Sequence, residues 1–99
     1  MTDQSARLKD AIRRLHGCEA QHVESVRVRE TFQGAIVWDG IVEVFALAGH
    51  PSAKRCHAWI VNEPDASERY VAVLEVPPVD SPAAAVRAAI VADSKRINP

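Results

Sequence analysis

The chain has 99 residues, of which 47% are hydrophobic, 25% charged and 5% aromatic, the ordinary range for a globular domain. Twelve Lys and Arg residues against thirteen Asp and Glu give a formal charge of -1, which disfavours nucleic acid, because proteins that bind it usually carry a basic surface. No apolar run approaches the roughly 18 residues of a membrane-spanning helix. We therefore expect one α+β domain over residues 1–99 and no membrane association.

The first element is predicted to be an amphipathic helix over Thr2 to His16. Leu8, Ile12 and Leu15 recur at helical spacing, and basic residues occupy much of the remaining arc. Gly17 follows, and glycine readily takes the left-handed conformation that ends a helix. The N-terminal residues do not show a basic segment followed by an apolar one, so we expect a cytoplasmic protein with reduced cysteines.

Four strands are predicted next, because the apolar period changes from about 3.6 residues to 2. Their expected ranges are Glu24 to Phe32, Ile36 to Leu47, Arg55 to Asn62 and Arg69 to Val76. Short connections between them are typical of an antiparallel meander. The first strand alternates apolar and charged residues, which predicts one polar face. The last is apolar on both sides, which suggests an interior position in the sheet.

The first hairpin has two candidate turns. A turn at Gln33-Gly34 would leave Gly40 as a bulge in the second strand. The alternative is a turn at Asp39-Gly40, because an Asp-Gly pair between apolar runs is a strong hairpin signal. We favour Gln33-Gly34, since the other turn would lengthen the first strand to about 15 residues, well beyond the usual length.

A second helix is predicted over Ala83 to Arg96. Ser81 and Pro82 stand in the order expected for a helix cap and a first helical residue. The element order is therefore α-β-β-β-β-α, which belongs to the α+β class. We expect a single antiparallel meander sheet with the N- and C-terminal helices packed on one of its faces.

Histidine and cysteine residues fall into two groups. The first group is His16, Cys18 and His22, and the second is His50, Cys56 and His57. Neither group has the paired spacing of a zinc site, so we expect no metal and no cofactor. A cysteine nucleophile needs a histidine base in the same cleft, which a small meander sheet offers poorly. A non-enzymatic binding module is the preferred interpretation, and an enzyme or metal-binding protein built on these groups is the alternative.

The segment from Gly49 to Arg55 is the first candidate binding site. It sets His50 near two cations, Lys54 and Arg55, in a connection between two strands. These cations and the backbone amides can hold an anionic ligand. The same residues also suit a rigid connection whose cations protect a sheet edge.

The exposed sheet face is the second candidate site. Arg27 and Arg29 are two residues apart and share one face of their strand, with Trp38 and Trp59 on other strands. Basic and aromatic side chains on a sheet can bind single-stranded nucleic acid or RNA, but cross-strand ion pairs explain the same arginines. We therefore expect a protein or an anionic molecule as the partner. The two free edges of a four-stranded sheet would also allow a homodimer.

The residues from Trp38 to Pro51 carry a resemblance to a known family. They read Trp-Asp-Gly-Ile-Val-Glu-Val-Phe-Ala-Leu-Ala-Gly-His-Pro. This is similar to the Trp-x-Gly-x-Val-Glu-Val-Phe-x-Leu-x-Gly-His-Pro signature of a family of small uncharacterised bacterial proteins. The resemblance continues through Val71 to Leu74 and Pro77 to Pro82. It implies a bacterial protein and brings no activity, cofactor or catalytic residue with it.

The order of elements also resembles the double-stranded-RNA-binding domain, in which a sheet lies between an N-terminal helix and an alanine-rich C-terminal helix. That family grips phosphates with lysines at the start of its last helix. The matching positions here are Ser81, Pro82, Ala83, Ala84 and Ala85. Because no cation precedes Arg87 in this helix, the resemblance implies the topology and not RNA binding.

Overall fold

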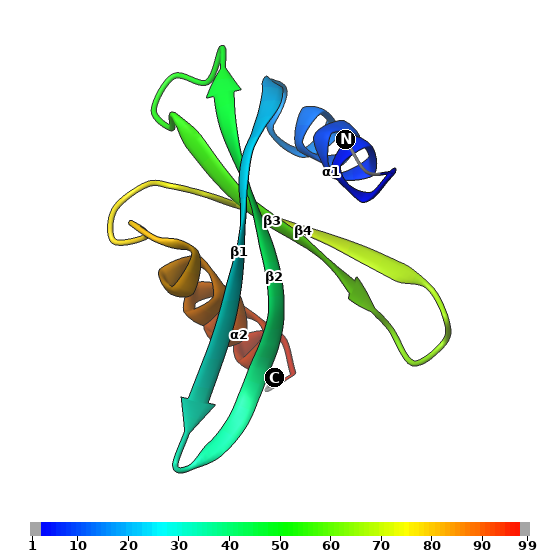
Figure 1. Cartoon of the computed structure of the whole chain (residues 1–99), viewed down its shortest axis with the longest axis vertical. Coiled ribbons are helices and arrows are strands. Elements are labelled where there is room, and N and C mark those ends of the chain that lie inside the picture. The colour runs from blue at the N-terminus through cyan, green and yellow to red at the C-terminus, as the bar shows by residue number, and fades with distance from the viewer. Residues whose placement is uncertain (1–2, 98–99) are drawn as a thin grey trace.

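The computed structural model describes the backbone of residues 3–97 and the side chains of residues 4–93. Its elements are α1 (Asp3–His16), β1 (Glu19–Phe32), β2 (Ala35–Ala48), β3 (Arg55–Asn62), β4 (Glu68–Leu74) and α2 (Pro82–Ile97). The strands form one antiparallel sheet in the order β1-β2-β3-β4 (Figure 1), so the α+β class and the meander are confirmed. Thr2, the predicted start of the first helix, lies outside the described residues. Within residues 3–97, neither helix is long and apolar enough to span a membrane.

The first hairpin turns at Gln33 and Gly34, as predicted. Their φ angles are 52° and 79°, and two positive values give the kind of turn whose twist matches that of antiparallel strands. Gly40 pairs directly with Val28, so the predicted bulge at Gly40 is wrong. β1 and β2 are each 14 residues long. Strand length therefore does not distinguish the two candidate turns, whereas the backbone conformation of Gln33 and Gly34 suits a two-residue hairpin turn.

Val23 is an extra residue in β1 and changes which side chains face each side of the sheet. His22 pairs with Phe45 and Glu24 with Val44, so Val23 has no partner in β2. Such a bulge reverses the alternation of side chains beyond it. The reversal also explains why β1 was predicted to begin at Glu24, since the regular alternation starts only after the bulge.

The two helices pack on opposite faces of the sheet, and the prediction that both pack on one face is wrong. One buried cluster consists of Leu8, Ile12, Cys18, Phe45, Cys56 and Ala58. The other consists of Val28, Val42, Trp59, Ala85 and Val86. Ala58 and Trp59 are neighbours on β3, and neighbouring residues of a strand point to opposite faces. α1 therefore covers one face and α2 the other, and Figure 1 shows them on either side of the strands.

β4 is apolar on both faces because each face lies under a helix. Tyr70 and Ala72 pack against the α1 cluster, whereas Val71 and Val73 pack against the α2 cluster. β4 is nevertheless an edge strand of the sheet, so the interior position predicted for it is wrong. Apolar residues on both faces indicate two covering layers and do not by themselves place a strand in the centre.

β2 and β3 pair over only part of their length. The register covers four residue pairs, from Glu43 with Ala58 to Ala46 with Arg55. Beyond this region β2 extends back to Ala35 and β3 forward to Asn62. Figure 1 shows the hairpin of β1 and β2 diverging there from the hairpin of β3 and β4. The sheet is therefore open between β2 and β3.

Candidate binding site between two diverging strands

A hollow of about 360 Å³ lies at the opening between β2 and β3, and we call it the β2–β3 slot. Its lining residues are Gln4, Trp38, Asp39, Gly40, Ile41, Trp59, Ile60 and Val61. Gln4 comes from the first turn of α1 and the others come from the two strands. The slot thus brings together Trp38 and Trp59, two of the residues singled out from the sequence.

The backbone edges of both strands face into the slot. Leu47 N–H donates to the Lys54 carbonyl at 2.8 Å, which shows that every second residue of β2 directs its backbone groups toward β3. Continued beyond the last paired residues, this alternation places four N–H and four C=O groups at the opening. They belong to Asp39, Ile41, Ile60 and Asn62. Unpaired strand edges of this kind can pair with another extended chain.

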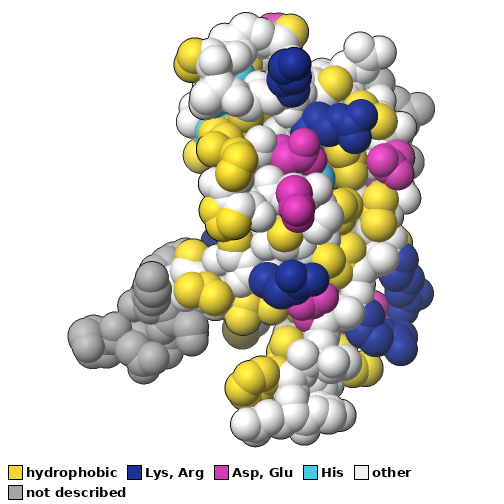
Figure 2. Space-filling model, turned by 90° about the vertical axis from the view of Figure 1, so that its left-hand side faces the viewer, with side chains coloured by type: hydrophobic (Ala, Val, Ile, Leu, Met, Phe, Trp, Pro, Cys, Tyr) yellow, Lys and Arg dark blue, Asp and Glu magenta, His cyan; other side chains and the backbone are white. Residues whose placement is uncertain are grey.

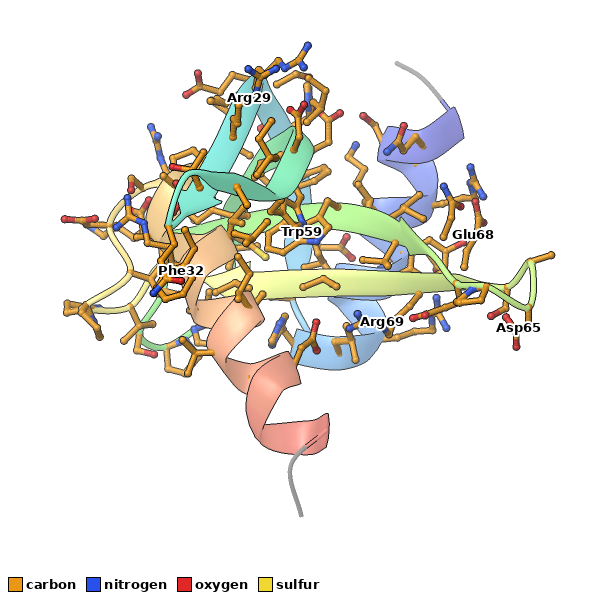
Figure 3. All side chains as sticks on the ribbon, turned by 90° about the horizontal axis from the view of Figure 1, so that it is seen from below. Arg29, Phe32, Trp59, Asp65, Glu68 and Arg69 are labelled. Carbon is orange, nitrogen blue, oxygen red and sulfur yellow. The ribbon has the colours of Figure 1, made fainter. Side chains whose placement is uncertain are left out.

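The two tryptophans line the side of the slot that faces α2. Their rings meet edge to face with centroids 5.5 Å apart, a favourable arrangement for an aromatic pair. Trp59 is only 3% exposed and lies near the centre of the molecule in Figure 3, whereas Trp38 is half-buried. A Cβ added to Gly40 would lie 3.1 Å from the Trp38 ring. The missing side chain at Gly40 therefore gives the Trp38 indole its room.

Among residues 4–93, whose side chains the structure describes, Asp39 carries the only ionisable side chain that lines the slot. Arg27 Nη2 lies 3.1 Å from both of its carboxylate oxygens, and Arg29 Nη2 lies 3.4 Å from one of them. The hydrogen bond from Arg27, assisted by the charges of both arginines, holds the pKa of Asp39 below its ordinary value. Asp39 is therefore ionised at neutral pH, and the three side chains together keep one positive charge beside the slot.

His50, Lys54 and Arg55 lie away from the slot. Their loop begins about ten residues along β2 from Asp39, a span of roughly 30 Å in a strand. The Nδ1 atom of His50 accepts hydrogen bonds from the backbone N–H of Ser52 at 3.1 Å and of Ala53 at 2.9 Å. A bound anion would need these amides as donors, but the imidazole already occupies them. This favours the interpretation of the segment as a rigid connection.

The structure therefore brings some of the predicted site residues together and leaves others apart. Trp38 and Trp59 line the slot, and Arg27 and Arg29 border it through Asp39. The tryptophans share the α2 side of the sheet with Val26 and Val28, so the arginines that alternate with these valines lie on the other side. The prediction of one exposed sheet face that carries both the arginines and the tryptophans is therefore wrong. The 49–55 loop does not converge with them. On the face shown in Figure 2, basic and acidic side chains are interspersed among apolar ones, and no broad surface of one charge forms there.

No family model, curated protein or solved structure matches this chain. Its function is therefore inferred from the chemistry of its own residues.

The cysteines are core residues. Cys18 and Cys56 are both buried, both free and part of the cluster beneath α1. Burial raises the pKa of the Cys56 thiol to about 12, and the nearby Cys18 adds to the rise. Cys56 is thus a poor thiolate nucleophile near neutral pH. Within the part of the chain whose side chains are described, no group of three His, Cys, Asp or Glu residues is placed to hold a metal ion.

Two histidines pair with glutamates across the sheet. His22 Nε2 lies 2.8 Å from Glu43 Oε1, and the Ser25 hydroxyl donates to the same oxygen. His57 is 1% exposed, and its Nε2 lies 3.0 Å from Glu75 Oε1. These pairs were missed in the sequence because the register of the strands creates them. An acidic residue inside the apolar run of β2, such as Glu43, was the available signal, since a buried charge needs a partner.

Gln4, Ile41, Ile60 and Val61 also line the slot and were not singled out from the sequence. Their role depends on where the pairing of β2 with β3 stops, which no local pattern of residues reveals. The one local signal is the spacing of Trp38 and Gly40, because a glycine two residues from a tryptophan on the same face of a strand leaves space for the indole.

Proposed function

We propose that the protein is a non-enzymatic binding module that takes a protein partner in the β2–β3 slot. One observation carries this proposal: β2 and β3 stop pairing while both strands continue, and a hollow of about 360 Å³ lies between them. Proteins usually cover or blunt unpaired strand edges, because such edges attract other chains. An edge left open beside two tryptophans has the features of a recognition site, since aromatic residues are enriched where proteins meet.

The chemistry of the slot supports binding over catalysis. Of its eight described lining residues, Asp39 alone can ionise, and two arginines hold it as a carboxylate. The lining therefore includes no nucleophile with a neighbouring base, which catalysis by a cysteine, serine or histidine would need. A single-stranded nucleic acid has less support, because Trp59 is too buried to stack on a base and Arg27 and Arg29 share Asp39.

Two narrower expectations belong to this proposal. The chain would be a member of the bacterial family whose signature residues 38–51 resemble, and it would act in the cytoplasm. The two reduced core cysteines are compatible with that compartment, where thiols stay reduced.

Peptide selection with a matched pair of variants tests the proposal. Ile41 lines the slot and is 44% exposed, so Ile41→Glu should fold and place a negative charge in the opening, beside Asp39 on the same face of β2. Ile36 is 56% exposed on the same strand and does not line the slot, so Ile36→Glu is the control. Peptides selected from a random heptapeptide display library on the wild type should bind Ile36→Glu equally well and bind Ile41→Glu at least about tenfold more weakly.

The readout is the affinity of each selected peptide for the three proteins, together with the two indole N–H signals in nitrogen-15 NMR spectra. Binding in the slot should move the signal of Trp38. Equal affinity for all three proteins would place the peptides elsewhere and contradict the proposal. A weakening of equal size in both variants would do the same, because it would reflect the added charge and not the slot.

A further inference from the structure

We infer that the partner enters the β2–β3 slot as an extended strand and is recognised mainly through its main chain. This inference rests on the proposed function, because it names the kind of segment that the same slot accepts. It goes further in stating which atoms make the contact and which side chains of the partner suit the two sides of the slot.

The first argument is the balance of polar groups in the slot. Main-chain groups of four residues point into the opening, as the alternation in β2 and β3 requires. The polar side chains of the lining are Gln4, Asp39 and the indole N–H groups of the tryptophans, and Asp39 is already paired with arginines. Most hydrogen bonds available to a partner therefore come from the backbone of β2 and β3. An extended chain is the ligand that supplies alternating donors and acceptors at the matching spacing.

The second argument is the length of the free edges. Beyond the last paired residues, the unpaired part of β2 covers residues 35–42 and that of β3 covers residues 59–62. Val37 has no partner in β1, since Glu30 pairs with Trp38 and Thr31 with Ile36. This second bulge interrupts the ladder of β2, so the regular part runs from Trp38 to Val42. Five residues match the usual length of a strand, which is about 5 to 6. We therefore expect the partner to pair with β2, the longer edge, in the antiparallel direction, which is the more stable one.

The third argument is the difference between the two sides of the slot. Side chains of a bound strand alternate, so every second one points toward Trp38 and Trp59 and the others toward the side of α1. The tryptophan side is apolar and favours an aliphatic side chain. The exposed Arg27 and Arg29 keep one positive charge beside the slot, on the same side of β1 as Asp39 of β2, which favours an acidic side chain there. The fitting segment alternates aliphatic and acidic residues.

A capped heptapeptide of alternating glutamate and valine is the probe that tests this inference. Two further versions carry N-methyl groups on the valine amides or on the glutamate amides. The amides of a strand alternate between its two edges, so each version blocks one edge and leaves the side chains unchanged. We expect the unmethylated peptide to bind wild type and Ile36→Glu, and one methylated version to bind at least about tenfold more weakly, as the loss of several hydrogen bonds requires.

Backbone amide signals of Ile41 and Ile60 report whether the slot is occupied, and those of Phe45 and Cys56, in the paired part of the same strands, are the reference. If both methylated peptides bind as tightly as the parent and still move the signals of Ile41 and Ile60, main-chain recognition is wrong while the proposed function stands. If the parent peptide leaves these signals unchanged at millimolar concentration, the strand inference is overturned by itself, since the display selection judges the proposed function independently.

Discussion

Cys56 tests the claim that the cysteines are structural and not catalytic. Its side chain is fully buried, and burial, with a contribution from Cys18, raises the pKa of the thiol from 9.0 to about 12. Alkylating reagents react with the thiolate and not with the thiol. A rise of this size lowers the fraction of thiolate at pH 8 about a thousandfold. Native Cys56 should therefore react at least that much more slowly than an exposed cysteine.

Alkylation by iodoacetamide at pH 8, followed by mass spectrometry, measures this rate. The variant Cys18→Ser leaves Cys56 as the only thiol, and the same variant in concentrated urea gives the rate of the exposed side chain. The native rate should be at least about a thousandfold lower than the rate in urea, because burial also excludes the reagent. Equal rates in the native protein and in urea would refute the reasoning and return the cysteine-based enzyme to consideration.

Three further predictions concern Cys56, Gly40 and His50. The folded protein holds the Cys56 proton above pH 9, whereas the unfolded chain releases it. The free energy of unfolding should therefore fall faster with rising pH in wild type than in Cys56→Ala, by up to about 1.4 kcal/mol per pH unit. Urea titrations of both proteins from pH 9 to 11 would contradict this if the two pH dependences had the same slope. Gly40→Ala should push the Trp38 ring away from Trp59 and lower the free energy of unfolding by about 0.5 to 1.5 kcal/mol. The near-ultraviolet circular dichroism spectrum should change as well, and an unaltered spectrum would show that the indole does not need the space. His50→Ala should free the amides of Ser52 and Ala53 and speed their hydrogen exchange, and unchanged exchange would mean that the imidazole does not organise the loop.

The elements of the fold follow from local patterns in the sequence. β3 occupies the predicted residues, Arg55–Asn62, because alternation and flanking turn residues both mark its ends. The first turn is also local, since its two central residues, Gln33 and Gly34, take the positive φ angles of a tight hairpin turn. The placement of the helices is not local. It depends on which face of β3 and β4 each apolar stripe covers, and the apolar residues on both faces of β4 were the clue that two layers are needed.

The candidate site was only half visible in the sequence. Trp38, Trp59, Arg27 and Arg29 were singled out by residue type, and all four lie in the slot or at its border. Their meeting point could not be predicted, because it exists only where β2 and β3 stop pairing. The 49–55 loop was the more conspicuous candidate, yet His50 takes up the amides of Ser52 and Ala53.

Amide hydrogen exchange of the free protein tests the open slot most directly. Ile41 and Ile60 direct their N–H groups into the opening, whereas Phe45 and Cys56 direct theirs to each other in the paired part of β2 and β3. The amides of Ile41 and Ile60 should therefore exchange orders of magnitude faster than those of Phe45 and Cys56. Equal protection of all four amides would mean that the strands pair throughout, and the slot with its proposed partner would be contradicted.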